Sequence, residues 1–158
     1  MNKLSILLCA HCPNANYDNL LVKAINSVYE QSYKDYKLYI VLDECWEGTL
    51  SKVKDMITLD TEIIIRNKKE GLARAKNEGL KRINTEYVAF LDADDEYLPG
   101  KLEKQMNFIE NNNVDFLGTL ATIKNKGQIY PSGFFVGQYE NHEQIYNRIF
   151  LINIDPCV

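Results

Sequence analysis

The feature that most constrains this chain is an apolar run that leads directly into a cluster of acidic residues. Tyr87–Leu91 is short, aromatic and β-branched and follows a helical pattern, so it predicts a buried central strand. Four carboxylates come within the next five residues, namely Asp92, Asp94, Asp95 and Glu96. In an open α/β sheet the ligand crevice lies at the carboxyl ends of the strands. The run therefore predicts a ligand site where this strand ends.

Asp92 and Asp94 are spaced to bind one cation. Side chains two positions apart in an extended backbone point the same way, and a divalent ion relieves the repulsion between clustered carboxylates. Oxygen ligands suit Mg²⁺ or Mn²⁺ better than Zn²⁺. An acidic, solvated turn is the alternative. Against it, Leu98–Pro99 begins a helical pattern, which makes residues 92–97 a tight strand-to-helix connection.

Strand-like and helix-like stretches alternate along the first two thirds of the chain. We expect strands over Lys3–Cys9, Tyr36–Leu42, Glu62–Ile65 and Tyr87–Leu91, and helices from Asp18 as the cap to Gln31, over Leu50–Ile57, over Gly71–Ile83 and over Pro99–Glu110. Each of three helices has an apolar stripe that we expect to be buried. The stripe is Leu20, Leu21, Ala24, Ile25 and Val28 in the first helix. It is Leu72, Ala75 and Leu80 in the helix over Gly71–Ile83, and Leu102, Met106 and Ile109 in the helix over Pro99–Glu110. This alternation predicts an α/β fold with a mainly parallel sheet, right-handed crossovers and helices on both faces.

The last third of the chain is less regular. It is expected to hold strand formers over Val114–Ile123, a hairpin turn at Asn125–Gly127 into Gln128–Tyr130, a loop over Pro131–Gly137, a helix over Glu140–Phe150 and the start of a strand in Leu151–Val158. A length of 158 residues predicts a single domain, 1–158.

The bulk charge and hydropathy exclude two classes of partner. A net charge of −4 gives no support for nucleic acid, which usually needs a basic face. No apolar run approaches the length needed to cross a bilayer. The apolar stretch Leu4–Ala10 is too short, and nothing resembling a signal cleavage site follows it. We therefore expect a cytoplasmic protein without a transmembrane segment.

The cysteines do not form a disulfide framework in a chain of this size. Cys9–Cys12 resembles a redox or zinc motif. However, Pro13 and Asn14 follow where a redox motif would begin a helix, and the sequence offers no good second ligand pair for zinc. Reduced cysteines that line a loop are the favoured interpretation.

Gly71–Leu80 and Glu86–Pro99 together resemble the family 2 glycosyltransferases of the GT-A fold. Two weaker matches lie upstream in the order expected for that family: Ala24–Tyr33, with its Ser and Gln, and Ile40–Glu44, which ends in an acidic pair. The resemblance covers residues 3–110. It implies a GT-A, Rossmann-like domain that binds a nucleotide sugar.

The resemblance also implies roles for single residues. Asp94 matches the family's main metal-contacting position, and Asp92 matches the first acid of the Asp-x-Asp motif, near the sugar or ribose. Asp43 matches the residue that reads the nucleotide base, usually uracil. The implied cofactor is Mn²⁺ or Mg²⁺, a Lewis acid for the diphosphate leaving group of a UDP-sugar.

The nucleotide pocket departs from the family pattern. The loop after the first strand, with Ala10 and His11, would form the other wall of the base pocket, but Cys9–Cys12 replaces the family's Tyr-Asn. Lys76 stands where the family usually has Arg; it keeps the charge and loses the planar fork. Arg74, one helical step away, is the candidate substitute.

The acceptor side has no matching motif. Inverting members need a carboxylate base to deprotonate the acceptor hydroxyl, and in the family this base lies downstream of the metal motif. None of the available late residues matches it: Glu140, His142, Glu143 and Asp155. The resemblance therefore implies either that the domain is truncated on its acceptor side, with the base beyond Val158, or that the chain is an unusually short member of the family.

The resemblance implies a metal-dependent, inverting transfer of sugar from a UDP-sugar to a saccharide or lipid-linked acceptor in cell-surface polysaccharide biosynthesis. Peripheral membrane association of the full-length protein is compatible with this. Two alternatives stay open: a fragment that binds nucleotide and metal without turnover, and a metal-dependent signalling receiver domain. A receiver would need a phosphorylatable Asp and a Lys on a later strand, and Gly71–Asn77 argues against it.

Overall fold

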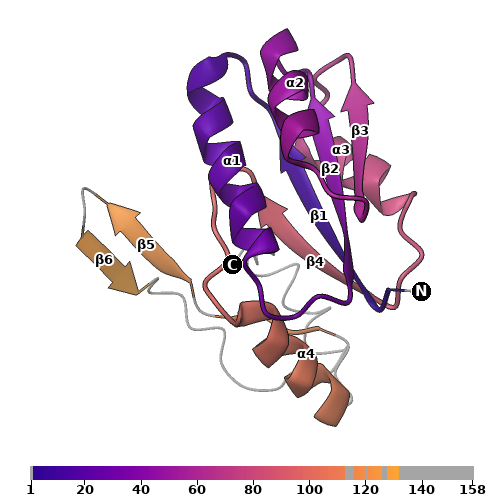
Figure 1. The fold of residues 1–158 in the computed structure, drawn as a ribbon, viewed down its shortest axis with the longest axis vertical. Coiled ribbons are helices and arrows are strands. Elements are labelled where there is room, and N and C mark those ends of the chain that lie inside the picture. Colours follow the sequence, from indigo (N-terminus) through magenta and orange to yellow (C-terminus); the bar gives the residue numbers. More distant parts are fainter. Residues whose placement is uncertain (1, 113–115, 120, 126–127, 132–158) are drawn as a thin grey trace, which may run out of the picture. The chain divides into compact units, whose positions relative to one another are not determined.

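One parallel sheet organises the first part of the molecule. The computed structural model describes residues 2–112, 116–119, 121–125 and 128–131, and the chain divides into two compact units, Met1–Lys104 and Gln105–Val158. In the first unit the sheet has the order β3-β2-β1-β4, and every neighbouring pair is parallel. Its strands are β1 (Leu4–Ala10), β2 (Tyr36–Asp43), β3 (Thr61–Arg66) and β4 (Tyr87–Asp92). All four strands therefore end at the same edge of the sheet (Figure 1).

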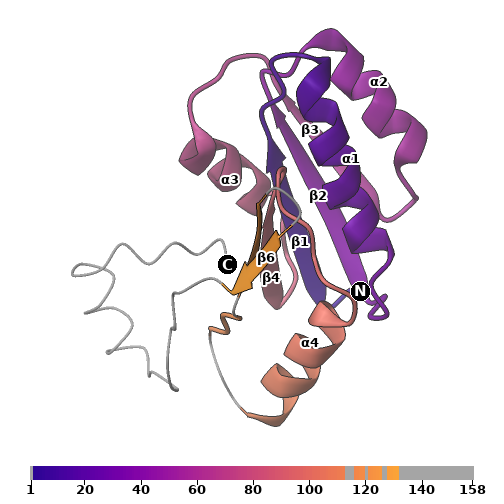
Figure 2. The ribbon, with the colours of Figure 1, turned by 90° about the vertical axis from the view of Figure 1, so that its left-hand side faces the viewer.

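Helices cover both faces of this sheet. α1 (Ala15–Tyr29) and α2 (Glu47–Met56) lie on one face, and α3 (Leu72–Leu80) lies on the other (Figure 2). The predicted α/β fold is confirmed. The order β3-β2-β1-β4 differs from the order 2-1-3-4-5 of flavodoxin-like receivers. The receiver alternative is therefore wrong.

The core is built on β1, because its almost continuous apolar run is buried on both faces, as is usual for an inner parallel strand. The expectation that Tyr87–Leu91 is a buried central strand is wrong for the described residues. β4 pairs with β1 on one side and is the edge strand of this sheet. Its side chains are accordingly half-buried, except for Leu91, which is buried.

α3 contacts the sheet through small residues rather than through leucines. Ala75 and Gly79 are buried, and a Cβ atom at Gly79 would lie 2.3 Å from a methyl group of Leu7. This close approach leaves Leu72 and Leu80 outside the contact, 49% and 38% exposed. The prediction that both leucines point inward is therefore wrong. In α1, Leu20 is likewise exposed, whereas the other four residues of the predicted stripe are buried.

α1 begins earlier than the sequence predicts. Asn14 is its N-cap, and the Asn14 side chain accepts a hydrogen bond from the backbone N–H of Asn16. Asp18 is therefore not the cap but a buried residue of the first turns, 1% exposed. The other helices and strands differ from the predicted ranges by a few residues at their ends.

The Asp18 carboxylate joins α1 to α2 and to the loop before it. It accepts hydrogen bonds from Trp46 Nε1 at 3.1 Å and from Thr49 Oγ1 at 2.7 Å, and Lys52 Nζ lies 3.0 Å away. Burial opposes the charged form, but the hydrogen bonds from Thr49, Lys52 and Trp46 outweigh it and lower the pKa of Asp18. The network therefore requires an ionised Asp18.

The second unit is described in part. α4 (Lys101–Asn111) runs into it, and β5 (Thr122–Asn125) pairs antiparallel with β6 (Gln128–Pro131), as the hairpin turn predicts. The strand expected over Val114–Ile123 begins only at Thr122; its described residues before that point have no regular structure. The predicted loop after Pro131, the helix Glu140–Phe150 and the strand Leu151–Val158 lie outside the described residues. In the part of the chain that is described, no helix combines the length and the apolar character needed to span a membrane.

Asp18→Asn tests the buried network. We expect the free energy of unfolding at pH 7 to fall by about 2–3 kcal/mol, because the buried hydrogen bonds and the ion pair are weakened together. The folded pKa of Asp18 lies below its ordinary value of 3.8. Its stabilisation is therefore complete above pH 3.8 and is lost as the pH falls through the folded pKa. The difference between variant and wild type, measured by urea denaturation, should shrink as the pH falls from about 5 to about 2.

The matched control is Asp55→Asn, at an exposed position of α2. It should change stability by no more than about 0.5 kcal/mol. A deficit of Asp18→Asn that stays constant over the whole pH range would contradict the role of the charge.

Candidate functional site

The carboxyl edge of the sheet brings two predicted clusters to one place in the fold. The chain leaves β1 toward β2 on one side, and β4 pairs with β1 on the other, so the strand order reverses between β1 and β4. Ligands of open α/β sheets bind at such a switch point. Cys9 is in register with Asp92 of β4, and Asp43 of β2 is in register with Arg66 of β3. Acidic side chains therefore end the strands on both sides of β1.

Asp92 has a buried oxygen that accepts no hydrogen bond from the described residues. The ammonium group of Lys76 lies 3.3 Å from this Oδ1 atom, close enough for an ion pair, while it also lies 5.5 Å from the centre of the Phe90 ring. A buried carboxylate oxygen without a hydrogen bond is costly. Lys76 is therefore an ion-pair partner of this oxygen, and Oδ1 has capacity for a further partner.

A divalent cation fits the acidic residues at the end of β4. Asp94 is exposed, and the backbone N–H of Asp95 donates to the carbonyl of Asp92, which closes a turn between them. Among the described residues no group of three or more His, Cys, Asp or Glu side chains could hold a metal. Mg²⁺ and similar ions are usually held by one or two carboxylates, with the other ligands from substrate phosphates and water. Asp94 lies in this turn and not in extended backbone, so the expectation that the spacing alone points both side chains the same way is wrong. A metal role for the Asp92–Asp94 pair stays a prediction, of an open site rather than a closed protein cage.

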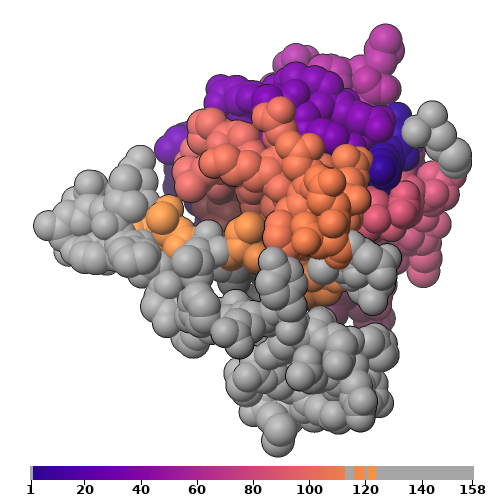
Figure 3. Space-filling model, turned by 90° about the horizontal axis from the view of Figure 1, so that it is seen from below, coloured from indigo at the N-terminus to yellow at the C-terminus, as the bar shows by residue number. Residues whose placement is uncertain are grey.

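Ser27 of α1 and Gln31, which follows the C-cap Glu30 of that helix, hold the backbone after the acids. Ser27 Oγ accepts from the N–H of Tyr97 at 3.0 Å. Gln31 Nε2 donates to the carbonyl of Leu98 at 3.0 Å, and Gln31 Oε1 accepts from the N–H of Leu102 at 3.1 Å. Figure 3 shows the start of α4, in salmon, against the end of α1 and the loop after it, in violet. The acidic segment is therefore fixed from α1.

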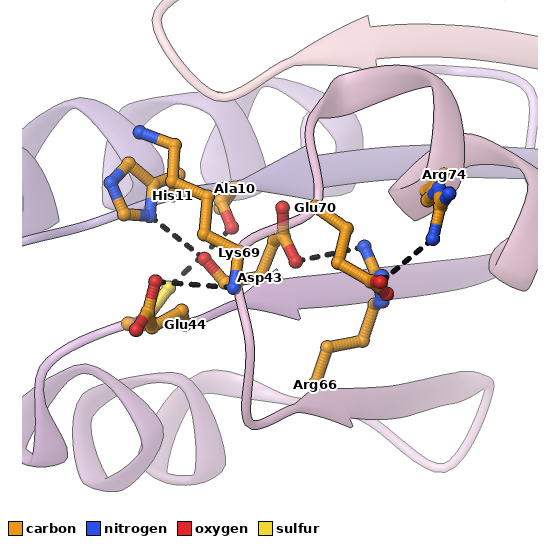
Figure 4. Close-up of polar contacts among 9 residues, drawn as sticks. Ala10, His11, Asp43, Glu44, Arg66, Lys69, Glu70 and Arg74 are labelled. Atoms are coloured by element: carbon orange, nitrogen blue, oxygen red, sulfur yellow. Dashed lines mark hydrogen bonds and ion pairs between the residues drawn. The ribbon is translucent and has the colours of Figure 1, made fainter.

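A second group of contacts surrounds Asp43, which is only 4% exposed. Its carboxylate is held by Arg66 at 2.8 Å, and its carbonyl oxygen lies 2.8 Å from His11 Nδ1 (Figure 4). Ala10 lies beside it, and its carbonyl accepts from the thiol of Cys45 at 3.5 Å. The structure thus brings Ala10, His11 and Asp43 together, as the sequence predicts.

Arg66 and Glu70 belong to this site and were missed by the sequence analysis. Glu70 bridges Arg66, at 2.6 Å, and Arg74, at 2.7 Å, so a line of alternating charges runs from Asp43 to Arg74 (Figure 4). A signal for Arg66 existed, since it ends the apolar run Ile63–Ile65 at the same sheet edge as Asp43. A signal for Glu70 existed as well, since both of its basic partners lie four positions away in the chain.

The two basic candidates divide between the two clusters. Lys76 pairs with Asp92 at the end of β4, whereas Arg74 pairs with Glu70 on the side of Asp43. Arg74 is 67% exposed at its side chain and Lys76 is 15% exposed. Lys76 is therefore the residue placed beside the carboxylate pair. The ligand-binding roles of these residues stay predictions.

Comparison with known proteins identifies a family that matches most of this chain. A sequence model described as Glycosyl transferase family 2 matches residues 9–157. The Escherichia coli protein UDP-Glc:alpha-D-GlcNAc-diphosphoundecaprenol beta-1,3-glucosyltransferase WfgD is 28% identical over 138 residues, which are 87% of this chain and 52% of that protein. This chain spans about half the length of that relative and a smaller part of others.

Solved structures share the fold. S. aureus TarS 1-349 in complex with UDP is 20% identical and has a TM-score of 0.64, over 78% of this chain and 40% of that one. The mannosyltransferase PcManGT from Pyrobaculum calidifontis, in complex with GDP-Man and Mn2+, is 22% identical with a TM-score of 0.54, over 61% of this chain and 28% of that one. These likenesses show that the chain shares its fold with those structures.

Gln31→Ala tests the tie between α1 and the segment after the acids. It leaves the carbonyl of Leu98 and the N–H of Leu102 without their buried partner, so the free energy of unfolding should fall by about 2–3 kcal/mol in urea denaturation. Ser32→Ala is the matched control, because it removes only an exposed hydrogen bond to Glu103. It should cost no more than about 0.5 kcal/mol. Equal costs for the two variants would refute the special role of Gln31.

Arg66→Met tests the charge line at Asp43. The substitution keeps much of the side-chain volume but leaves a buried carboxylate unpaired, so we expect a loss of about 2–4 kcal/mol at pH 7. Lys81→Met is the control, because its ion pair with Glu78 is exposed and should contribute less than about 1 kcal/mol. Thermal and urea unfolding at neutral pH measure both. A cost for Arg66→Met as small as that of the control would show that Asp43 does not need Arg66.

Proposed function

Because this chain belongs to glycosyltransferase family 2, we propose that it forms the donor-binding part of a metal-dependent, inverting glycosyltransferase that uses a UDP-sugar. The observation that carries the proposal is the buried Asp92 oxygen without a hydrogen bond, next to Asp94 at the switch point of the sheet. The E. coli relative is named for the donor UDP-Glc. The solved TarS structures contain UDP and UDP-GlcNAc.

The base of the nucleotide binds at Asp43. The carboxylate has two oxygens, and Arg66 takes Oδ1; we assign Oδ2 to an N–H donor of the uracil ring. The ion pair holds the almost fully buried Asp43 carboxylate in one orientation. Ala10 and His11 lie on the neighbouring strand end and line the same pocket, with His11 Nδ1 held at the Asp43 carbonyl.

The diphosphate binds at the end of β4. Asp92 and Asp94 would hold Mn²⁺ or Mg²⁺, and the ion, when bound, stabilises the negative charge that develops on the leaving diphosphate. Lys76 adds a fixed positive charge beside Asp92. Its ammonium group lowers the repulsion between the two carboxylates. The same group is already ordered before an anionic donor binds, so it can stabilise the negative charge of that donor. Ser27 and Gln31 hold the backbone, so that the carboxylates need not reorganise on binding.

The acceptor is a saccharide or a lipid-linked saccharide of cell-surface polysaccharide biosynthesis. This part of the proposal is supported by the E. coli relative, whose name specifies a diphosphoundecaprenol-linked acceptor. Location in the cytoplasm and peripheral association with a membrane go with such an acceptor and stay predictions. The carboxylate base for the acceptor hydroxyl is assigned to none of the residues described.

A second candidate is binding of nucleotide and metal without turnover. It is favoured by one observation, namely that this chain spans about half of the E. coli relative. Release of UDP from a UDP-sugar in the presence of acceptor saccharides separates the two candidates. Any acceptor-dependent release excludes the second one.

Calorimetric titration of UDP, with and without Mn²⁺, tests the donor site. We expect binding that depends on Mn²⁺ and that Asp94→Asn weakens by about tenfold or more, because the variant removes one anionic ligand. Glu96→Gln is the matched control: it removes a charge from the same exposed segment but lies outside the proposed ligand pair. It should leave UDP binding within about threefold of the wild type.

The outcomes of this titration are distinct. An equal loss in Asp94→Asn and Glu96→Gln would show that the segment acts only through its overall charge. Binding of UDP that is unaffected by Mn²⁺ would contradict the metal site and leave the nucleotide pocket supported. A folded wild type that binds no UDP would contradict the proposed donor.

A further inference from the structure

A pair of cysteines joins the loops that follow β1 and β2. Cys12 is 1% exposed and Cys45 is partly exposed. Cys45 Sγ accepts a hydrogen bond from the backbone N–H of Cys12 at 3.2 Å. The backbone N–H of Trp46 donates to the carbonyl of Cys12 at 2.8 Å and holds the same two loops together. Two cysteines 33 positions apart in the chain are thus in direct contact.

The two thiols are not equivalent. The hydrogen bond from the Cys12 thiol, helped by the Cys12 backbone N–H, lowers the pKa of Cys45. The same hydrogen bond, together with burial, raises the pKa of Cys12. The carboxylates of Asp18 and Asp43 face the Cys45 sulfur and oppose its ionisation, but they do not reverse the shift. Cys45 is therefore the thiol that ionises first, and it is also the more accessible of the two.

We propose that Cys12 and Cys45 form a reversible modification site, in which Cys45 reacts with low-molecular-weight disulfides and Cys12 resolves the adduct to an intramolecular disulfide. The proposal goes beyond the proposed function, because nothing in donor binding requires a thiol. It does not concern the Cys9–Cys12 motif of the sequence. Cys9 lies within the buried strand β1, whereas Cys12 faces a different chain segment.

The chemistry balances with oxidised glutathione as the oxidant. The Cys45 thiolate attacks one sulfur of the glutathione disulfide, and the first glutathione leaves as a thiolate. The Cys12 thiol then loses its proton to that thiolate or to water, and its sulfur attacks Cys45 Sγ, which releases the second glutathione. Two protein thiols are oxidised to one disulfide, and one glutathione disulfide is reduced to two thiols.

The modification would act on the nucleotide pocket. A disulfide brings its sulfurs to about 2.05 Å, closer than hydrogen-bonded thiols, and it removes the S–H that Cys45 donates to the carbonyl of Ala10. Ala10 and Asp43 are two residues from Cys12 and Cys45 respectively, and both line the proposed base pocket. Oxidation should therefore weaken UDP binding, by about tenfold. This consequence rests on the proposed function; the disulfide itself does not.

The test incubates the folded chain with oxidised glutathione, alkylates the remaining thiols and maps the tryptic peptides by mass spectrometry. The expected product links peptide Leu4–Lys23, through Cys12, to peptide Leu38–Lys52, through Cys45. The link should persist in Cys9→Ala, the matched control within the same peptide, and disappear in Cys12→Ser. In Cys12→Ser, Cys45 should instead retain a glutathione adduct. UDP titration of the reduced and the oxidised wild type measures the effect on the pocket.

The outcomes test the disulfide, its effect on the nucleotide pocket and the proposed function separately. No linked peptide in the wild type, or a link that survives Cys12→Ser, would overturn the proposal. Linked peptides with unchanged UDP affinity would overturn the coupling to the pocket. Linked peptides in a chain that binds no UDP even when reduced would support the thiol pair and contradict the proposed function.

Discussion

The arrangement of the candidate site depends on hydrogen bonds from Ser27 of α1 and from Gln31, just after that helix, to the backbone after β4. The acids at this point are exposed and repel one another, so apolar packing cannot hold them in place. Ser27 and Gln31 supply the missing ties at Tyr97, Leu98 and Leu102. Because Ser27 and Gln31 are buried, breaking these bonds would leave backbone groups unpaired. Asp92 is placed by the pairing of β4 with β1, and the backbone after the acids is tied to the end of α1 and to Gln31.

The same helix also anchors the other side of the site. Asp18 binds Trp46 and Thr49, and Trp46 is bound through its N–H to the loop that contains Cys12. The loops after β1 and β2 are therefore tied both to each other and to α1. A ligand that bridges Asp43 and Asp92 would contact two clusters whose backbones are held from one element. This is the preorganisation that a nucleotide diphosphate site needs, since its binding energy is then not used to order loops.

Charge is distributed unevenly between the two clusters. Around Asp43, each buried or partly buried acid has a partner in the line Asp43–Arg66–Glu70–Arg74. At Asp92, Lys76 lies beside the carboxylate, and one buried oxygen accepts no hydrogen bond from the described residues. The first cluster is thus a continuous line of ion pairs, whereas the second contains an oxygen with capacity for a further ligand. That difference is the reason to assign a neutral base to the first cluster and a cation with its diphosphate to the second.

The sequence by itself determined the α/β class, the strand-end acids and the family resemblance, because these depend on local periodicity and on short motifs. The apolar run of β1 and the acids after Tyr87–Leu91 are examples, and so is the hairpin before Gln128. Only the tertiary structure decided the partners of Asp18, Asp43 and Cys45, which lie 23 to 33 positions away in the chain. It also decided that Leu72 and Leu80 are exposed, since the close approach of Gly79 to Leu7 leaves them no room in the contact. The periodicity of a sequence indicates which face of a helix or strand is apolar. A contact between residues distant in the chain forms only when the sheet is assembled, because the sheet determines how far apart they lie.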